Sequence, residues 1–172
     1  MNRQQTDIRQ NLRLSRLFTS CLGLGFLPVA PGTWGSLPPA VIFALLSYFA
    51  VPPVIISVIM MVMLFDGVMF CLLFAPSVIK ATDNKDPCEV VADELAGQAI
   101  TFLVVPFFMG TISPILVALI GFLAFRMFDI FKPWPCRKLE NLPAGLGIAA
   151  DDLMAGIYAA LLLQLCVYLI GK

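Results

Sequence analysis

Charged residues in this 172-residue chain are confined to three segments, and long apolar stretches without charge separate them. The segments cover residues 1–16, 77–97 and 126–152, and outside them only Asp66 and Lys172 are charged. Charged residues make up 13% of the chain and apolar residues 60%, and a soluble domain of this length could not bury so much apolar surface. The pattern therefore predicts a membrane protein, and it argues against a disordered chain and a water-soluble globule.

The apolar stretches have the lengths of membrane-embedded helices, and proline and glycine residues divide them. We expect an all-α fold, a polytopic membrane helical bundle with short or re-entrant helices and a polar site on the cytoplasmic face. Residues 1–172 should form a single membrane-embedded domain, with apolar helices at about 37–50, 54–75, 98–111, 113–125 and 153–171. At a rise of about 1.5 Å per residue, the helices at 54–75 and 153–171 can cross an apolar core of about 30 Å or nearly so.

The stretch 98–125 is either one kinked span or a hairpin of two short helices, because it contains Pro106, Gly110 and Pro114. The basic residues of all three charged segments should lie on the cytoplasmic side. Hairpins at 37–75 and 98–125 satisfy this rule, whereas a single span at 98–125 would place the charged segments on opposite sides of the membrane. We therefore favour the hairpin.

The N-terminal segment 1–21 is basic and amphipathic. Its part from residue 7 onward suits a surface helix lying in the lipid head groups, and a solvated, partly frayed terminus is an equal alternative. Its arginines are spread out and no compact apolar core follows them directly, so we do not expect a cleavable signal peptide.

Several classes of site and partner are excluded by residue type. The chain has no histidine, which rules out histidine nucleophiles, histidine general bases and histidine-ligated zinc. Its five cysteines show no CxxC spacing, and we expect them to be reduced packing residues. Lys and Arg together number 11, and Asp and Glu together also number 11. The chain therefore has no excess of positive charge that would indicate a nucleic-acid partner.

Acidic residues gather where the second charged segment meets an apolar helix. Pro87 suits the first turn of that helix and Asp86 its cap, which would place Glu89 and Asp93 on one helical face. A solvated acidic helix start explains Glu89 well. It explains Asp93 and Glu94 poorly, because the apolar stretch begins directly after them.

The third charged segment contributes an acidic and a basic set. Arg126 and Asp129 lie three residues apart at the end of an apolar helix, where a plain interfacial salt bridge with an aromatic belt is the alternative. Basic side chains among aromatic residues also suit the phosphate of an anionic lipid head group, and the candidates are Arg126, Lys132, Arg137 and Lys138. Asp151 and Asp152 follow a glycine-rich turn, and a helix start capped by Asp151 is the alternative there.

Two further features are weaker. Residues 28–36 predict a tight glycine-rich loop leading into a helix, with Ser36 near the helix cap. The hydroxyls of Thr33 and Ser36 could bind a phosphate there. The alternative is that the loop is only a capped turn. Asp66 lies within the apolar stretch 54–75, where a carboxylate is costly. It could be protonated or face a polar cavity, and we do not assign it to the catalytic site.

Under the favoured topology the acidic residues share one membrane depth. A cluster of carboxylates without histidine or cysteine selects a hard cation, above all Mg²⁺, and basic neighbours suit phosphoryl chemistry. The candidate metal ligands are Glu89, Asp93, Glu94, Asp129, Asp151 and Asp152.

Four sequence blocks, at residues 32–36, 89–97, 125–135 and 147–156, together resemble the phosphatidylglycerophosphatase A family. The similarity covers nearly the whole chain after residue 20, in the order typical of the family. It implies an all-helical phosphatase of the bacterial inner membrane that depends on Mg²⁺. Such an enzyme converts phosphatidylglycerophosphate to phosphatidylglycerol and inorganic phosphate.

We expect hydrolysis by a water molecule that bound Mg²⁺ activates, with Asp93, Asp129 and Asp151 as catalytic residues. The substrate would be held by Thr33, Ser36, Arg126, Lys132, Arg137 and Lys138. The expected partners are phosphatidylglycerophosphate and bilayer lipid, with no protein partner. Two alternatives stay open: an enzyme like the CDP-alcohol phosphatidyltransferases, whose full motif is absent, and a non-enzymatic membrane transporter or scaffold.

Overall fold

The computed structural model describes residues 3–143 and 145–172, and this part of the chain is helical and contains no strand. Its elements in chain order are α1 (Arg3–Thr19), η1 (Leu24–Phe26), α2 (Pro31–Tyr48), α3 (Pro53–Thr82), α4 (Ala92–Phe102), η2 (Val105–Phe107), α5 (Pro114–Phe131), α6 (Cys136–Leu139) and α7 (Gly145–Ile170). Three of them, α3, α5 and α7, are long and apolar enough to cross a membrane. The all-helical membrane fold predicted from the apolar stretches is confirmed.

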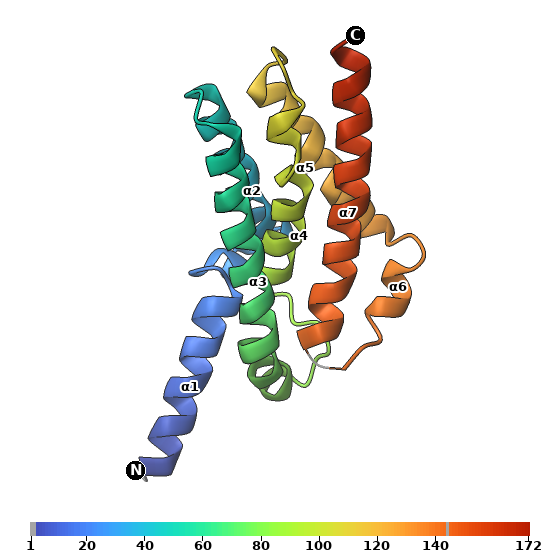
Figure 1. The fold of residues 1–172 in the computed structure, drawn as a ribbon. Coiled ribbons are helices and arrows are strands. Elements are labelled where there is room, and N and C mark those ends of the chain that lie inside the picture. The colour runs from blue at the N-terminus through green and yellow to red at the C-terminus, as the bar shows by residue number, and fades with distance from the viewer. Residues whose placement is uncertain (1–2, 144) are drawn as a thin grey trace.

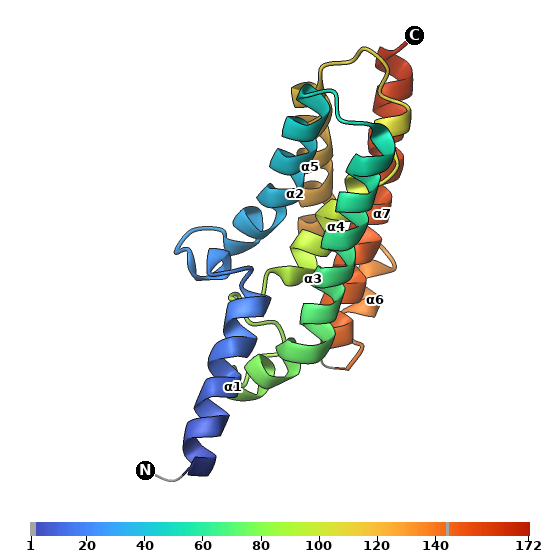
Figure 2. The same cartoon turned by 60° about the vertical axis from the view of Figure 1, so that its left-hand side comes forward.

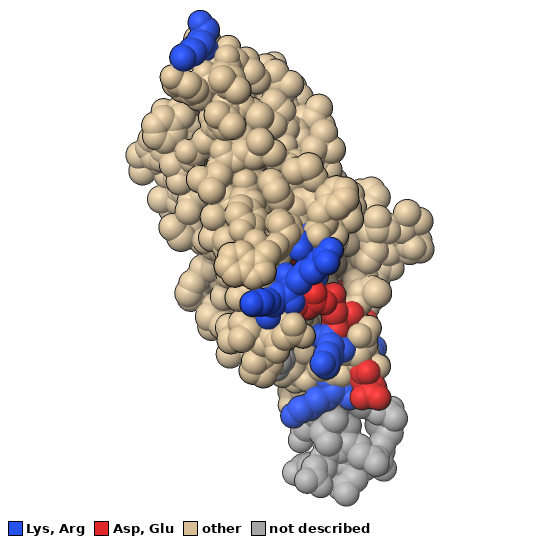
Figure 3. Space-filling view, turned by 90° about the vertical axis from the view of Figure 1, so that its right-hand side faces the viewer, with Lys and Arg blue, Asp and Glu red and all other residues tan. Residues whose placement is uncertain are grey.

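The helices form two hairpins followed by a long final helix (Figure 1). The turn between α2 and α3 and the turn between α4 and α5 lie at the same end of the bundle as the C-terminus (Figures 1 and 2). The loop 83–91, helix α1 and the segment around α6 lie toward the opposite end. Acidic and basic side chains accordingly gather on this half of the molecule, and on the face shown the other half is free of charge except at its tip (Figure 3).

Several helices extend further into the charged segments than expected. α5 continues to Phe131, because Arg126 and Asp129 form an ion pair of 2.6 Å within it and so neutralise each other. α7 begins at Gly145 rather than near residue 153, since the missing side chain of Gly145 lets the helix start against the backbone of Cys71 in α3. The alternative in which Asp151 caps this helix is therefore wrong.

The expected helix start at Asp86 and Pro87 is also wrong, because residues 83–91 form a loop and α4 begins at Ala92. A tertiary contact competes with the local signal: the N–H of Val91 donates to the carbonyl oxygen of Thr19 over 2.8 Å. This bond ties the loop to the end of α1.

Helix α1 is continuous over Arg3–Thr19, which disagrees with a frayed terminus over those residues. It contacts α3 through Phe18, whose ring lies 5.0 Å from that of Phe74 and 5.1 Å from that of Phe70. Asn11 and Leu12 still lie beside the end of α3, and the N-terminal part of α1 projects past the bundle (Figures 1 and 2). Its location in the lipid head groups stays a prediction.

Helix α4 is the central element and packs against α2, α3, α5 and α7. Its apolar end is fixed by Phe102, which is fully buried and stacks on Phe43 of α2 with ring centroids 4.5 Å apart. Closer to its beginning, α4 and α7 meet through glycines: a methyl group on Gly156 would collide with the carbonyl group of Gly97. The two backbones are therefore in direct contact, and they run in the same direction (Figure 1).

Candidate active site

Three carboxylates lie together one helical turn before this glycine contact. Asp93 and Glu94 precede Gly97 on α4, and Asp152 precedes Gly156 on α7. Carboxylate oxygens of the three residues all lie within 4.8 Å of one another. Asp93 and Asp152 are buried, with 6% and 3% of their surface exposed. Parallel helices in backbone contact thus bring together acidic residues that are almost sixty positions apart in the chain.

Basic side chains hold two further carboxylates beside this cluster. Arg126 pairs with Asp129 over 2.6 Å at the end of α5, and Lys132 donates a hydrogen bond of 2.6 Å to Asp151 of α7. Lys132 also lies 3.5 Å from Glu140. Asp129, Lys132 and Asp151 border a small polar cavity of about 50 Å³. Its full lining is Asp86, Asp93, Glu94, Asp129, Lys132, Ile148, Asp151 and Asp152.

The electrostatics of the cluster are those of crowded, buried acids. Burial raises the pKa of Asp93 well above its ordinary range, and the neighbouring Glu94 adds to this effect. Burial also raises the pKa of Glu94 to about 8, and the charges of Asp152 and Asp129 act in the same direction. The nearby Arg126 lowers the pKa of Glu94 but does not offset these effects. Without a counter-charge, Glu94 therefore holds its proton at neutral pH.

The surroundings of Lys132 favour its charged form, whereas those of the acidic cluster disfavour the charged form of the carboxylates. Burial alone would lower its pKa, but the hydrogen bond to Asp151 and the charges of Asp151 and Glu140 outweigh burial and raise it. The residue ends α5 in a left-handed conformation, with φ of 43°, which turns the chain toward α6. Lys132 is therefore a firmly charged group beside the acidic cavity.

The donor set fits a hard divalent cation. Among the described residues, one buried oxygen in each of Asp93, Glu94 and Asp152 has no hydrogen-bond partner. Unpaired buried carboxylate oxygens are costly, and three carboxylates within 4.8 Å of one another offer the oxygen ligands that Mg²⁺ prefers. These three residues could hold a metal ion, and Asp129 and Asp151 border the same cavity.

The first turn of α2 lies directly on the cluster. A methyl group on Gly32 would collide with Oε1 of Glu94 and would lie 3.2 Å from Nη1 of Arg126. The helix begins at Pro31, so the expectation that Ser36 lies near its cap is wrong. Ser36 is instead fully buried, and its hydroxyl donates to the carbonyl oxygen of Gly32 over 2.9 Å. Thr33 lies half-buried in that first turn.

Other predicted site residues lie outside the cavity. Glu89 forms an ion pair of 3.1 Å with Arg16 of α1 and is not part of the three-carboxylate cluster. Arg137 and Lys138 are exposed on α6 and do not line the cavity. The Lys138 ammonium group lies 5.8 Å from the ring centroid of Trp134.

Sequence reasoning missed two acidic residues near the cavity. Asp86, interpreted as a helix cap, lines it from the loop before α4, and Glu140 reaches Lys132 from the end of α6. No local sequence pattern places either residue at the cavity, because the path of the segment that carries it depends on tertiary contacts. All five cysteines are free, as expected.

Comparison with known proteins extends this picture. One relative is a protein of Bacteroides thetaiotaomicron named "Putative phosphatidylinositol-3-phosphatase", which is 36% identical over 87% of this chain and 91% of its own length. Proteins named phosphatidylglycerophosphatase A from Escherichia coli K12 and Haemophilus influenzae are each 35% identical. The alignment with the Escherichia coli protein covers 80% of this chain and 74% of that protein. The alignment with the Haemophilus influenzae protein covers 81% of this chain and 80% of that protein. No solved structure matches the chain.

The family profile of phosphatidylglycerophosphatase A matches residues 17–167, which include every residue of the acidic cavity. This match agrees with the four sequence blocks and favours a phosphatase over a phosphatidyltransferase or a non-enzymatic membrane protein. The chain belongs to the phosphatidylglycerophosphatase A family and is a membrane-embedded lipid phosphatase.

Proposed function

We propose that this enzyme hydrolyses the terminal phosphomonoester of phosphatidylglycerophosphate in a reaction that requires Mg²⁺. The observation that carries the metal requirement is the buried cluster of Asp93, Glu94 and Asp152, whose oxygens lie within 4.8 Å of one another. The family supports the phosphatase activity itself. Bound there, Mg²⁺ would supply a Lewis acid and lower the pKa of a coordinated water.

The protein's own residues suit the remaining tasks. Asp151 is held by Lys132 through one oxygen, while its other oxygen is buried without a partner among the described residues. We propose that this free oxygen accepts the proton of the attacking water. Asp129 is fixed in the same way by Arg126 and completes the acidic wall of the cavity.

Two cations, Arg126 and Lys132, pair with carboxylates that line the cavity. Nε of Arg126 is buried and has no hydrogen-bond acceptor among the residues described, so it is free to donate to a phosphate oxygen. Lys132 lines the cavity with its charge. We propose that these two side chains offset the charge that develops on the phosphoryl oxygens. Arg137 and Lys138 are proposed to act further out, on the head group or on neighbouring anionic lipids.

We propose that the site faces the cytoplasm from the bacterial inner membrane. The three charged segments lie at one end of the bundle, and all basic residues except Lys172 belong to them. Basic residues near membrane helices favour the cytoplasmic side. The reaction then takes place at the membrane surface while the acyl chains remain in the bilayer.

Phosphatidylinositol 3-phosphate is a second candidate substrate, because the name of the Bacteroides thetaiotaomicron relative specifies it. Both lipids carry a phosphomonoester on a polyol that is linked to the lipid by a phosphodiester. Phosphatidic acid lacks this polyol. A comparison of the three lipids therefore tests head-group selection.

Phosphate release from these three lipids by the purified full-length protein in detergent micelles, with Mg²⁺ or with EDTA, tests the proposal. We expect release from phosphatidylglycerophosphate only with Mg²⁺. Asp93→Asn and Asp151→Asn should each lower kcat by at least about a hundredfold. The matched control Asp83→Asn changes an exposed carboxylate at the end of α3 and should leave the rate unchanged. Wild-type rates in both site variants, or full activity in EDTA, would overturn the proposed site.

A further inference from the structure

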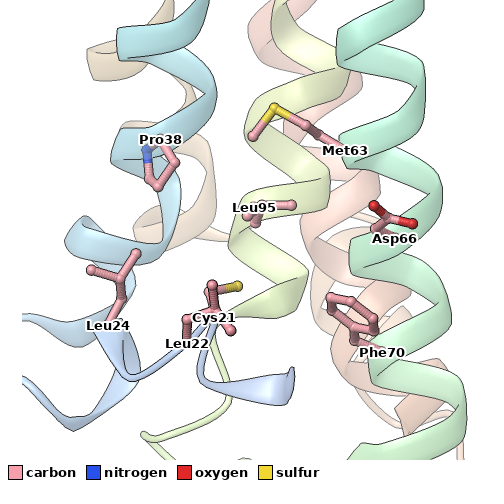
Figure 4. A pocket seen from close by; sticks show the side chains of 8 residues that line it. All are labelled: Cys21, Leu22, Leu24, Pro38, Met63, Asp66, Phe70 and Leu95. Carbon is pink, nitrogen blue, oxygen red and sulfur yellow. The ribbon is translucent and has the colours of Figure 1, made fainter. Parts of the chain in front are cut away.

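A second cavity lies beside the active site and opens on the apolar surface of the protein (Figure 4). It has a volume of about 330 Å³ and is formed by α2, α3, α4 and the turn after α1. The residues that line it are Cys21, Leu22, Leu24, Pro38, Met63, Asp66, Phe70 and Leu95. Its walls are apolar apart from one carboxylate and one thiol.

The carboxylate is that of Asp66, the residue that the catalytic cluster does not use. Met63, Asp66 and Phe70 are spaced by three and four residues, so they lie on one face of α3, and this face borders the cavity. Among the side chains of residues 10–143 and 145–172, no hydrogen bond or ion pair involves that of Asp66. A carboxylate within a candidate membrane span usually faces a polar cavity or a ligand path.

The cavity and the active site share the beginning of α4. Leu95, which lines the cavity, directly follows Glu94 of the acidic cluster, and the two side chains point about 100° apart around the helix. On the other side, the Cys21 thiol lies 3.8 Å from the carbonyl oxygen of Val91, the residue before the first turn of α4. One turn of helix therefore separates the two sites.

We propose, on the basis of the function proposed above, that this cavity holds the glycerol backbone and the proximal part of one acyl chain of the lipid substrate. The head group would then reach the acidic cavity around the first turn of α4. The apolar walls beside α3, a candidate membrane span, match an acyl chain, which is the apolar ligand available in a bilayer. A purely apolar occupant would leave Asp66 unpartnered, whereas the ester groups of a phospholipid bring water that can donate to it.

Filling the cavity separates this inference from the proposed function. Met63→Trp and Leu24→Trp, alone and together, reduce the space without touching the acidic cluster. We expect the double variant to raise the apparent KM for phosphatidylglycerophosphate by at least about tenfold, because a single extra or missing methylene group in a hydrophobic pocket already changes discrimination by about 10–200-fold. Hydrolysis of the deacylated head group, glycerophosphoglycerophosphate, should keep its wild-type kcat/KM. Leu161→Trp, at an exposed position on α7 outside the cavity, is the matched control.

An unchanged KM for the lipid in the double variant, or equal losses on the lipid and on the deacylated compound, would overturn the inference. If the wild-type protein released phosphate from neither compound, the proposed function would fail instead. A measurement of lipid binding would then still test whether the cavity holds an acyl chain. For that measurement we choose phosphatidylglycerol with a photoactivatable diazirine in its acyl chain. Labelling should concentrate on Met63, Leu24 and Leu95 and should fall in the double variant; labelling equal to that of Leu161 would contradict the cavity assignment.

Discussion

Neutralising one acid of the cluster should stabilise the metal-free protein while removing its response to Mg²⁺. The variant is Asp152→Asn, which keeps the shape of the side chain. Two unit charges at most 4.8 Å apart repel by at least about 3.5 kcal/mol at an effective dielectric constant of about 20. At pH 7 the protein avoids part of this repulsion by keeping Glu94 protonated, since its pKa is about 8. We therefore expect a gain of about 1–3 kcal/mol in the free energy of unfolding without metal.

Thermal unfolding in micelles, followed by tryptophan fluorescence in EDTA and in Mg²⁺, measures this effect. For a chain of this length each kcal/mol corresponds to about 2–4 °C in Tm. The wild-type protein should gain stability from Mg²⁺, and Asp152→Asn should start higher and gain little. Asp83→Asn, in which the change is exposed and outside the cluster, should behave like the wild type. A variant that is less stable in EDTA, or that responds fully to Mg²⁺, would refute the reasoning.

Three further predictions concern the same site. Glu94 holds its proton more tightly in the folded protein than in the unfolded chain, because its pKa is raised from 4.5 to about 8. The stability of the metal-free protein should therefore fall as pH rises from about 4.5 to about 8 and then level off. Glu94→Gln should flatten this profile of Tm against pH. Lys132→Met should cost about 3 kcal/mol by leaving the buried Asp151 carboxylate unpaired, and a double-mutant cycle with Asp151→Asn should recover at least half of the loss. Gly156→Ala should force α7 away from Gly97 at a cost of about 1–3 kcal/mol, and the Tm shift produced by Mg²⁺ should shrink with it.

Charge placement along the chain predicts much of this architecture because the membrane restricts the alternatives. Helices are the only elements that satisfy every backbone group in a short apolar stretch. The positive-inside rule then brings the charged segments to one end of the bundle, and with them Asp93, Asp129 and Asp151. The ion pair of Arg126 and Asp129 follows from their spacing on a helix, because residues three apart are neighbours on its surface.

Local spacing fails where long-range contacts decide the path of the chain. The signals at Asp86 and Pro87 favour a helix start, but the hydrogen bond from Val91 to Thr19 holds this segment as a loop. Glu89 therefore meets Arg16 instead of facing Asp93. That pairing requires α1 to lie against α3 by way of Phe18, and nothing in the sequence near residue 89 specifies it.

The close approach of the three carboxylates depends on residues that have no chemistry of their own. Packed helices usually lie 8–10 Å apart between axes, which keeps acids on neighbouring helices from crowding together. Gly97 and Gly156 permit backbone contact between α4 and α7, and one turn earlier Asp93 and Asp152 are forced together inside the protein. Such packing concentrates like charges that would separate if the helices moved apart. A cation bound between them removes this conflict, and that is the physical reason to expect a metal at this crossing rather than a solvated acidic surface.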